Sequence, residues 1–161
     1  MASTLIHSQP ELRQALLAEP DKQGQLLFAF NKHAIAAAML ANGLTEGVVT
    51  YNGGSDEGQI EGSTFEGQDA DASTIKVDQA VMIYRWDQDT SLGGTELQFV
   101  NVPLAHAIHD LCEAAIELSG HNGFEDNEGG SGTFTLTAKD EAARLEHHDH
   151  YIESADSVHE L

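Results

Sequence analysis

Residues 104–137, LAHAIHDLCEAAIELSGHNGFEDNEGGSGTFTLT, contain a helix, an acidic glycine-rich loop and a strand in direct succession. Pro103 stands near the start of the helix, and apolar residues then recur at steps of three and four, the period of an amphipathic helix. Gly120 ends this pattern, because glycine commonly follows the last turn of a helix. Residues 133–137 are rich in the β-branched and aromatic side chains typical of a strand. The stretch therefore indicates a fold that mixes helix with sheet.

The sequence on either side of this stretch supplies the other elements. Residues 144–152 predict a strand that pairs antiparallel with residues 133–137 through a turn near Asp140 and Glu141. Apolar spacing and turn residues predict helices at 10–18 and from residue 22 or 25 to 41, and strands at 48–51, 59–65, 80–86 and 95–100. We therefore expect an α+β fold with two main helices packed on one face of a largely antiparallel sheet.

A single domain is expected from the length and composition. The chain has 161 residues, of which 40% are hydrophobic, enough for one core. We expect one domain over residues 1–161, with residues 1–20 as a loosely attached N-terminal segment. The only cysteine, Cys112, rules out an internal disulfide, and its apolar helical surroundings predict a buried thiol in a cytoplasmic protein. No apolar run is long enough to predict a membrane span.

The charge of the chain is strongly negative. Seven Lys and Arg residues stand against 27 Asp and Glu residues, giving a formal net charge of -20. Such a chain repels the phosphates of nucleic acids and anionic lipid head groups. We therefore expect no direct binding to nucleic acid or to membranes, and the protein partner that the charge favours is a basic one.

Two segments concentrate carboxylates among glycines between apolar runs, GGSDEGQIEG at residues 53–62 and HNGFEDNEGGSG at residues 121–132. We expect a small binding protein that acts by occupying a basic surface of another protein, without a cofactor. The partner that suits it is a nucleic-acid-binding enzyme, since arrays of carboxylates can mimic phosphates in a groove of Arg and Lys residues. The expected binding residues are the acids of the two segments, Asp56, Glu57, Glu61, Glu125, Asp126 and Glu128.

The alternative is a metal-dependent hydrolase that uses histidines beside the second segment. Its ligands for a divalent metal would be His121, Glu125, His148 and His150, with Asp56 or Glu61 as base. On a strand, His147 and Asp149 point to one face while His148 and His150 point to the other, so only half of this cluster can share a site. The spacing matches none of the familiar zinc motifs, and residues 123–132 follow neither an EF-hand nor a phosphate-binding loop. The sequence thus favours binding over catalysis.

Several of these motifs resemble a family of uncharacterised bacterial proteins, a domain of unknown function often encoded on plasmids and other mobile elements. The resemblance runs from about residue 31 to the C-terminus. It is carried by GSDEGQIE at 54–61, the helix from Leu104, HNGFEDNEG at 121–129 and YIES at 151–154. It implies that the two acidic segments form a shared functional surface, and it implies roles in conjugation, defence or counter-defence.

Overall fold

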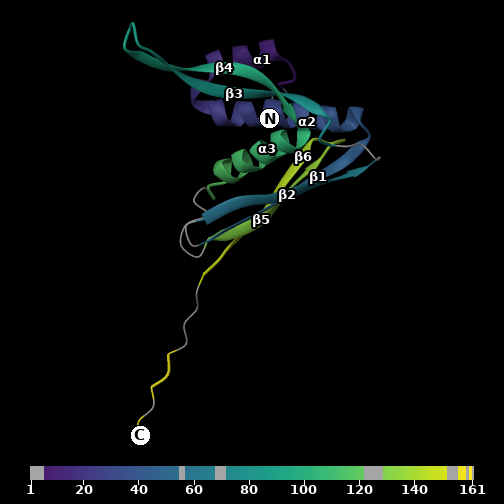
Figure 1. The fold of residues 1–161 in the computed structure, drawn as a ribbon, viewed down its shortest axis with the longest axis vertical. Helices are drawn as coiled ribbons and strands as arrows, with labels where there is room; N and C mark the ends of the chain where they lie inside the picture. The colour runs from purple at the N-terminus through teal and green to yellow at the C-terminus, as the bar shows by residue number, and fades with distance from the viewer. Residues whose placement is uncertain are drawn as a thin grey trace.

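The computed structural model describes residues 6–54, 57–67, 72–121, 129–151, 156–158 and 160. Within them the chain forms three α-helices, a 3-10 turn and six strands (Figure 1). In chain order the elements are α1 (Gln9–Ala18), η1 (Pro20–Lys22), α2 (Gln23–Ala41), β1 (Leu44–Gly54), β2 (Glu57–Gly67), β3 (Lys76–Asp87), β4 (Leu92–Pro103), α3 (Leu104–Leu118), β5 (Gly130–Thr137) and β6 (Ala142–Asp149).

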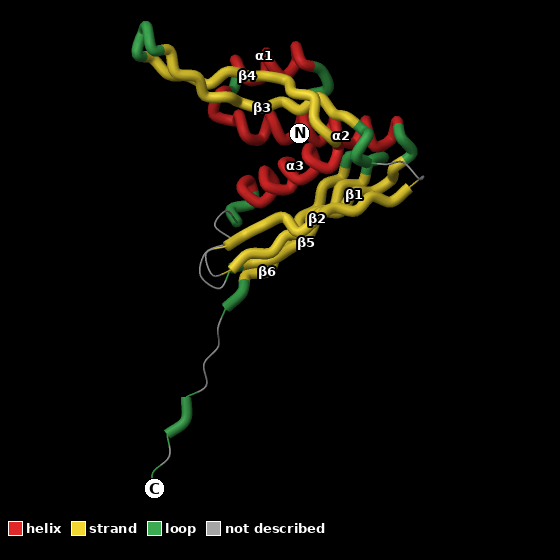
Figure 2. The backbone as a smooth tube through the Cα atoms, viewed as in Figure 1, coloured by secondary structure: helices red, strands yellow, loops and turns green. Residues whose placement is uncertain are grey.

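The strands form two separate sheets, seen in yellow in Figure 2. Four strands make a sheet in the order β2-β1-β5-β6, and β3 and β4 make a hairpin of their own. Every strand pair is antiparallel. The mixed helix and sheet class and the antiparallel pairing expected from the sequence are confirmed, while the strands do not join into one sheet.

A side chain of α2 binds the edge of β3 that faces away from β4. The amide of Asn31 in α2 donates to the Ala80 carbonyl oxygen at 3.0 Å and accepts from the Ala80 N–H at 2.8 Å. These two bonds satisfy the groups that another strand would have paired with. The hairpin is thereby fastened to α2.

The main core lies between α2, α3 and the four-stranded sheet. Figure 1 shows α3 between that sheet and the β3–β4 hairpin. Side chains of α3 such as Ile108 and Leu111 pack in one cluster with Met39 of α2, Val49 of β1 and Phe134 of β5. The cysteine of α3 belongs to the same cluster and is buried, as its helical spacing predicted.

A second, smaller cluster holds the N-terminal helix. Leu12 of α1 is fully buried and packs with Phe30 of α2 and Ala80 of β3. The Phe30 ring also meets the Phe99 ring of β4 edge-on, with centroids 5.5 Å apart. No helix among the described residues is both long enough and apolar enough to cross a membrane.

Candidate functional site

All four strands of the larger sheet reach the same end of the sheet, where β1 and β6 end and β2 and β5 begin. Gly58 of β2, Gly53 of β1, Gly130 of β5 and Asp149 of β6 stand side by side in the strand register. We call this row the sheet end. Because Gly53 and Gly130 belong to the two acidic segments, strand pairing brings the described parts of both segments to the same place.

The contact between the two segments requires glycine. Gly129 has a φ of +78°, and a Cβ at this position would lie 1.8 Å from the Gly53 carbonyl oxygen. A larger residue would therefore separate the segments as well as strain the backbone. The glycines that mark the segments in the sequence allow this close approach.

One of the six expected binding residues, Glu61, has a described side chain. It is exposed in β2 at an irregularity of the ladder, where Thr50 pairs with Gly62 but Tyr51 pairs with Ile60. Glu61 thus occupies a β-bulge, a feature that redirects side chains at sheet edges and binding sites. Glu57 begins β2, but its side chain lies outside the described residues, as do Asp56, Glu125, Asp126 and Glu128.

On the sheet face that packs against α3, Tyr51 and His147 are joined across Gly132. These three residues form one row of the sheet. A Cβ on Gly132 would lie 2.3 Å from the Tyr51 hydroxyl oxygen, so the missing side chain leaves room for the tyrosine ring. The Tyr51 hydroxyl reaches His147 Nδ1 at 2.6 Å, and His147 Nε2 lies 3.0 Å from an Asp149 carboxylate oxygen.

The protonation of this row follows from its burial. Burial is the main cause that raises the pKa of Tyr51 to about 12, and the neighbouring Cys112 and Asp149 contribute to the same shift. The tyrosine therefore keeps its proton at neutral pH, and its hydroxyl can donate to His147 Nδ1 in the tautomer that carries its proton on Nε2. In that tautomer the Nε2–H of His147 donates to Asp149. The result is a continuous hydrogen-bond chain from the core to the exposed carboxylate.

The C-terminal cap of α3 adds His121 to this chain. Gly120 adopts a φ of +80°, its N–H donates to the Glu117 carbonyl oxygen, and the His121 N–H donates to the Ile116 carbonyl oxygen. This is a Schellman cap, and it confirms that Gly120 ends the helix. The His121 ring stacks on the His147 ring with centroids 4.0 Å apart.

The three side chains His121, His147 and Asp149 could hold a metal ion. One ligand atom from each lies within 4.8 Å of the other two. Two imidazoles and a carboxylate suit Zn²⁺ and leave a fourth position for water. The Tyr51 oxygen is placed to accept the Nδ1–H of a metal-bound His147, the kind of outer partner that orients a metal ligand. We call these three residues the sheet-end cluster.

The histidines expected as ligands are divided between the two faces of the sheet. His148 and His150 line a shallow hollow of about 500 Å³ on the face away from α3, together with Glu61, Asn52 and Ser131. The hydroxyl of Ser131 lies 3.0 Å from His150 Nε2. His121 stacks on His147 at the opposite face, and Glu125 lies outside the described residues. The structure thus brings together Glu61, His148 and His150, but does not join them with His121.

Tyr51, His147 and Asp149 were not chosen as site residues from the sequence. The signal that could have found them is the spacing of Gly130 and Gly132, which lie two apart and therefore on one face of β5. A Cβ on Gly130 would lie 2.8 Å from the His147 ring, as one on Gly132 would meet Tyr51. Two glycines on one face of a strand indicate that large side chains of the neighbouring strands lie over them.

Comparison with known proteins gives a family but no activity. No curated protein and no solved structure matches the chain. Residues 27–161 match the model of a family described as "Family of unknown function (DUF6878)". Because this match covers most of the chain, including both acidic segments and the sheet end, the protein belongs to this family of unknown function.

Proposed function

We propose that this protein is a small acidic binding protein that acts by occupying a basic surface on another protein. The observation that supports it best is the pairing of Gly53 with Gly130, which brings the described parts of both acidic segments to the sheet end. The proposed contact residues are the acids of the two segments, Asp56, Glu57, Glu61, Glu125, Asp126 and Glu128.

The distribution of basic residues supports this proposal. The four strands of the larger sheet carry a single Lys or Arg, Arg144, and its guanidinium pairs with Glu146 at 2.5 Å. Acids on the same strands include the exposed Glu61 and Glu66 and the partly exposed Glu46. Because few basic side chains of the sheet neutralise these acids, the surface attracts basic partners and repels acidic ones.

The proposed partner is a nucleic-acid-binding enzyme of a defence system. Such an enzyme presents Arg and Lys side chains spaced for phosphates, and carboxylates can accept the same charge-assisted hydrogen bonds. The protein would then act in the cytoplasm as a nucleic-acid mimic or inhibitor in defence or counter-defence.

The test is capture of partners from the native host, followed by mass spectrometry. The bait is the wild-type protein or a variant with Asp56→Asn, Glu57→Gln, Glu125→Gln and Asp126→Asn. A matched control changes the same number of exposed acids away from the sheet end, with Asp21→Asn, Asp89→Asn, Glu113→Gln and Asp140→Asn.

A basic partner retained by the wild type and the control but lost with the first variant supports the proposal. The same partners retained by all three baits would contradict it, because net charge alone would then explain the binding. The control is needed for this reason, since both variants lose four negative charges.

A second candidate is a metal-dependent hydrolase, and the sheet-end cluster favours it. A divalent ion held by His121, His147 and Asp149 could activate a bound water at its fourth position. The test uses a His7→Ala background, because His7 belongs to another group of possible metal ligands, with His33 and Glu141. Zinc binding that weakens at least about tenfold when Asp149→Asn is added to this background supports the candidate. Equal zinc binding by the background protein with and without Asp149→Asn excludes it.

A further inference from the structure

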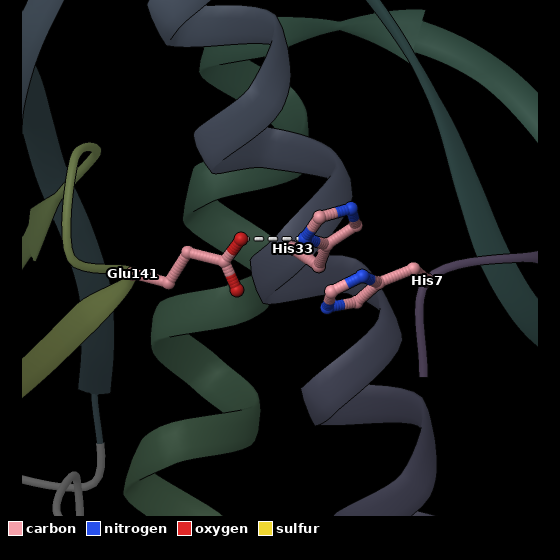
Figure 3. A group of neighbouring side chains, drawn as sticks. All are labelled: His7, His33 and Glu141. Carbon is pink, nitrogen blue, oxygen red and sulfur yellow. Dashed lines mark hydrogen bonds and ion pairs between the residues drawn. The ribbon is translucent and has the colours of Figure 1, made fainter. Parts of the chain in front are cut away.

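We infer that His7, His33 and Glu141 form a second site for Zn²⁺, which fastens the N-terminal helix to the body of the family fold. Figure 3 shows the three side chains converging from separate parts of the chain. His7 precedes α1, His33 lies in α2, and Glu141 lies in the turn between β5 and β6. We call them the N-terminal cluster.

The geometry of this cluster suits one ion. One ligand atom from each residue lies within 4.8 Å of the other two. The His33 Nδ1 atom lies 2.5 Å from a carboxylate oxygen of Glu141, and the His7 and His33 rings are stacked with centroids 3.8 Å apart. Ligand atoms around a tetrahedral Zn²⁺ are separated by roughly 3.3 Å, given bonds of about 2.0 Å to each. Small side-chain rotations therefore bring the three atoms to zinc-binding distances.

The chemistry of the three residues also favours zinc. Two imidazoles and a carboxylate are a donor set of zinc sites that leave the fourth position open to water. Zn²⁺ would replace the direct hydrogen bond between His33 and Glu141, and the negative charge of the chain attracts a cation. The side chains of His33 and Glu141 are 25% and 28% exposed, so an ion can reach them from solvent.

Each ligand is held in place by its own local structure. The His7 N–H donates to a carboxylate oxygen of Glu11, and Ser8 caps α1 by accepting from the Glu11 N–H. His33 is fixed in the middle of α2. The hairpin turn, with Glu141 at a φ of 52°, directs the glutamate towards α2. The three side chains therefore converge although the residues are far apart in sequence.

The function that follows is a clamp between two parts of the chain. The family match begins at residue 27, so it includes His33 and Glu141 but not His7. A zinc ion at this cluster would therefore link the segment ahead of the match to α2 and to the β5–β6 turn. Ile6 and Leu12 are buried nearby, and their apolar contacts also link this N-terminal segment to α2.

The experiment measures zinc binding by equilibrium dialysis of chelator-treated protein against ZnCl₂. All measurements use a His121→Ala background, which removes one ligand of the sheet-end cluster and leaves the N-terminal cluster intact. In this background we expect one zinc ion per chain. His7→Ala and Glu141→Gln should each lower the affinity at least about tenfold, since even outer-shell changes at metal sites often cost this much.

The matched control is His106→Ala, which removes an exposed histidine of α3 whose Nε2 atom lies 3.2 Å from an Asp110 carboxylate oxygen. It should bind zinc as tightly as the background protein. Zinc should also slow proteolytic cleavage within residues 6–22 of the background protein, but not of His7→Ala. The inference is overturned if the background protein binds no zinc, or if His7→Ala and Glu141→Gln bind it as tightly as the control. Circular dichroism spectra identify any variant that fails to fold, and His7→Ala alters only an exposed side chain.

Discussion

The Tyr51 hydroxyl and His147 Nδ1 are hydrogen-bonded across the backbone of Gly132, over an oxygen–nitrogen distance of 2.6 Å. This bond connects the central strand β1 to the edge strand β6, which are separated in the sheet by β5. It orients His147 towards Asp149 at the sheet end. The contact between Tyr51 and His147 thus depends on Gly132, because a side chain at that position would collide with the tyrosine.

Replacing Gly132 with alanine should destabilise the protein. The new Cβ would lie 2.2 Å from the Glu146 carbonyl oxygen and 2.3 Å from the Tyr51 hydroxyl oxygen, so backbone and ring must both shift. We expect the free energy of unfolding, measured with urea, to fall by about 2 kcal/mol or more. The control is Gly62→Ala in β2, where a Cβ meets no heavy atom within 4 Å and the change should stay below about 1 kcal/mol. Equal effects of the two substitutions would contradict this account.

Stability should decrease in alkaline solution through Tyr51. Its pKa is about 12 in the folded protein against 10.0 for an ordinary tyrosine, so the unfolded chain loses the proton first. The stabilisation is present below pH 10 and is lost as the pH rises towards 12, by about 2 kcal/mol. Measuring the free energy of unfolding from pH 8 to pH 12 should give a shallower decline for Tyr51→Phe than for the wild type. Cys112, whose pKa burial also raises to about 12, contributes equally to both proteins. Identical slopes would show that Tyr51 is not responsible.

Replacing Asn31 with alanine should weaken the attachment of the β3–β4 hairpin. The substitution removes both hydrogen bonds to Ala80, a residue that is only 2% exposed, and leaves a buried N–H and carbonyl without these partners. We expect a loss of about 2 kcal/mol in the free energy of unfolding. Asn42→Ala is the comparison, because it removes one exposed bond to the Ala38 carbonyl oxygen and should cost less than about 1 kcal/mol. A similar loss in both variants would mean that Asn31 does not hold the hairpin.

The local structure follows closely from the sequence. Helices expected at 10–18, from residue 22 or 25 to 41 and from residue 104 are observed at Gln9–Ala18, Gln23–Ala41 and Leu104–Leu118. The expected turn near Asp140 and Glu141 joins β5 to β6. These elements are specified by residues close together in the chain, through apolar spacing, glycine caps and hairpin turns.

The long-range arrangement could not be predicted in the same way. The pairing of β1 with β5 joins strands that are about 80 residues apart, and nothing within either strand specifies its partner. The attachment of β3 to α2 includes the two hydrogen bonds of Asn31, and nothing within the β3 sequence specifies that contact. The candidate site also depends on long-range contacts. Tyr51, His121 and His147 come together only after β1, α3 and β6 have been placed around Gly132.

The central claim, that the acidic sheet end binds a basic surface, is tested most directly by the salt dependence of the affinity for the captured partner. The dissociation constant is measured by calorimetry from about 50 mM to about 500 mM NaCl, for the wild type and the variant with Asp56, Glu57, Glu125 and Asp126 neutralised. We predict that wild-type affinity falls at least about tenfold over this range, and that the variant binds more weakly at low salt with a shallower dependence. A wild-type affinity that does not change with salt would contradict the account.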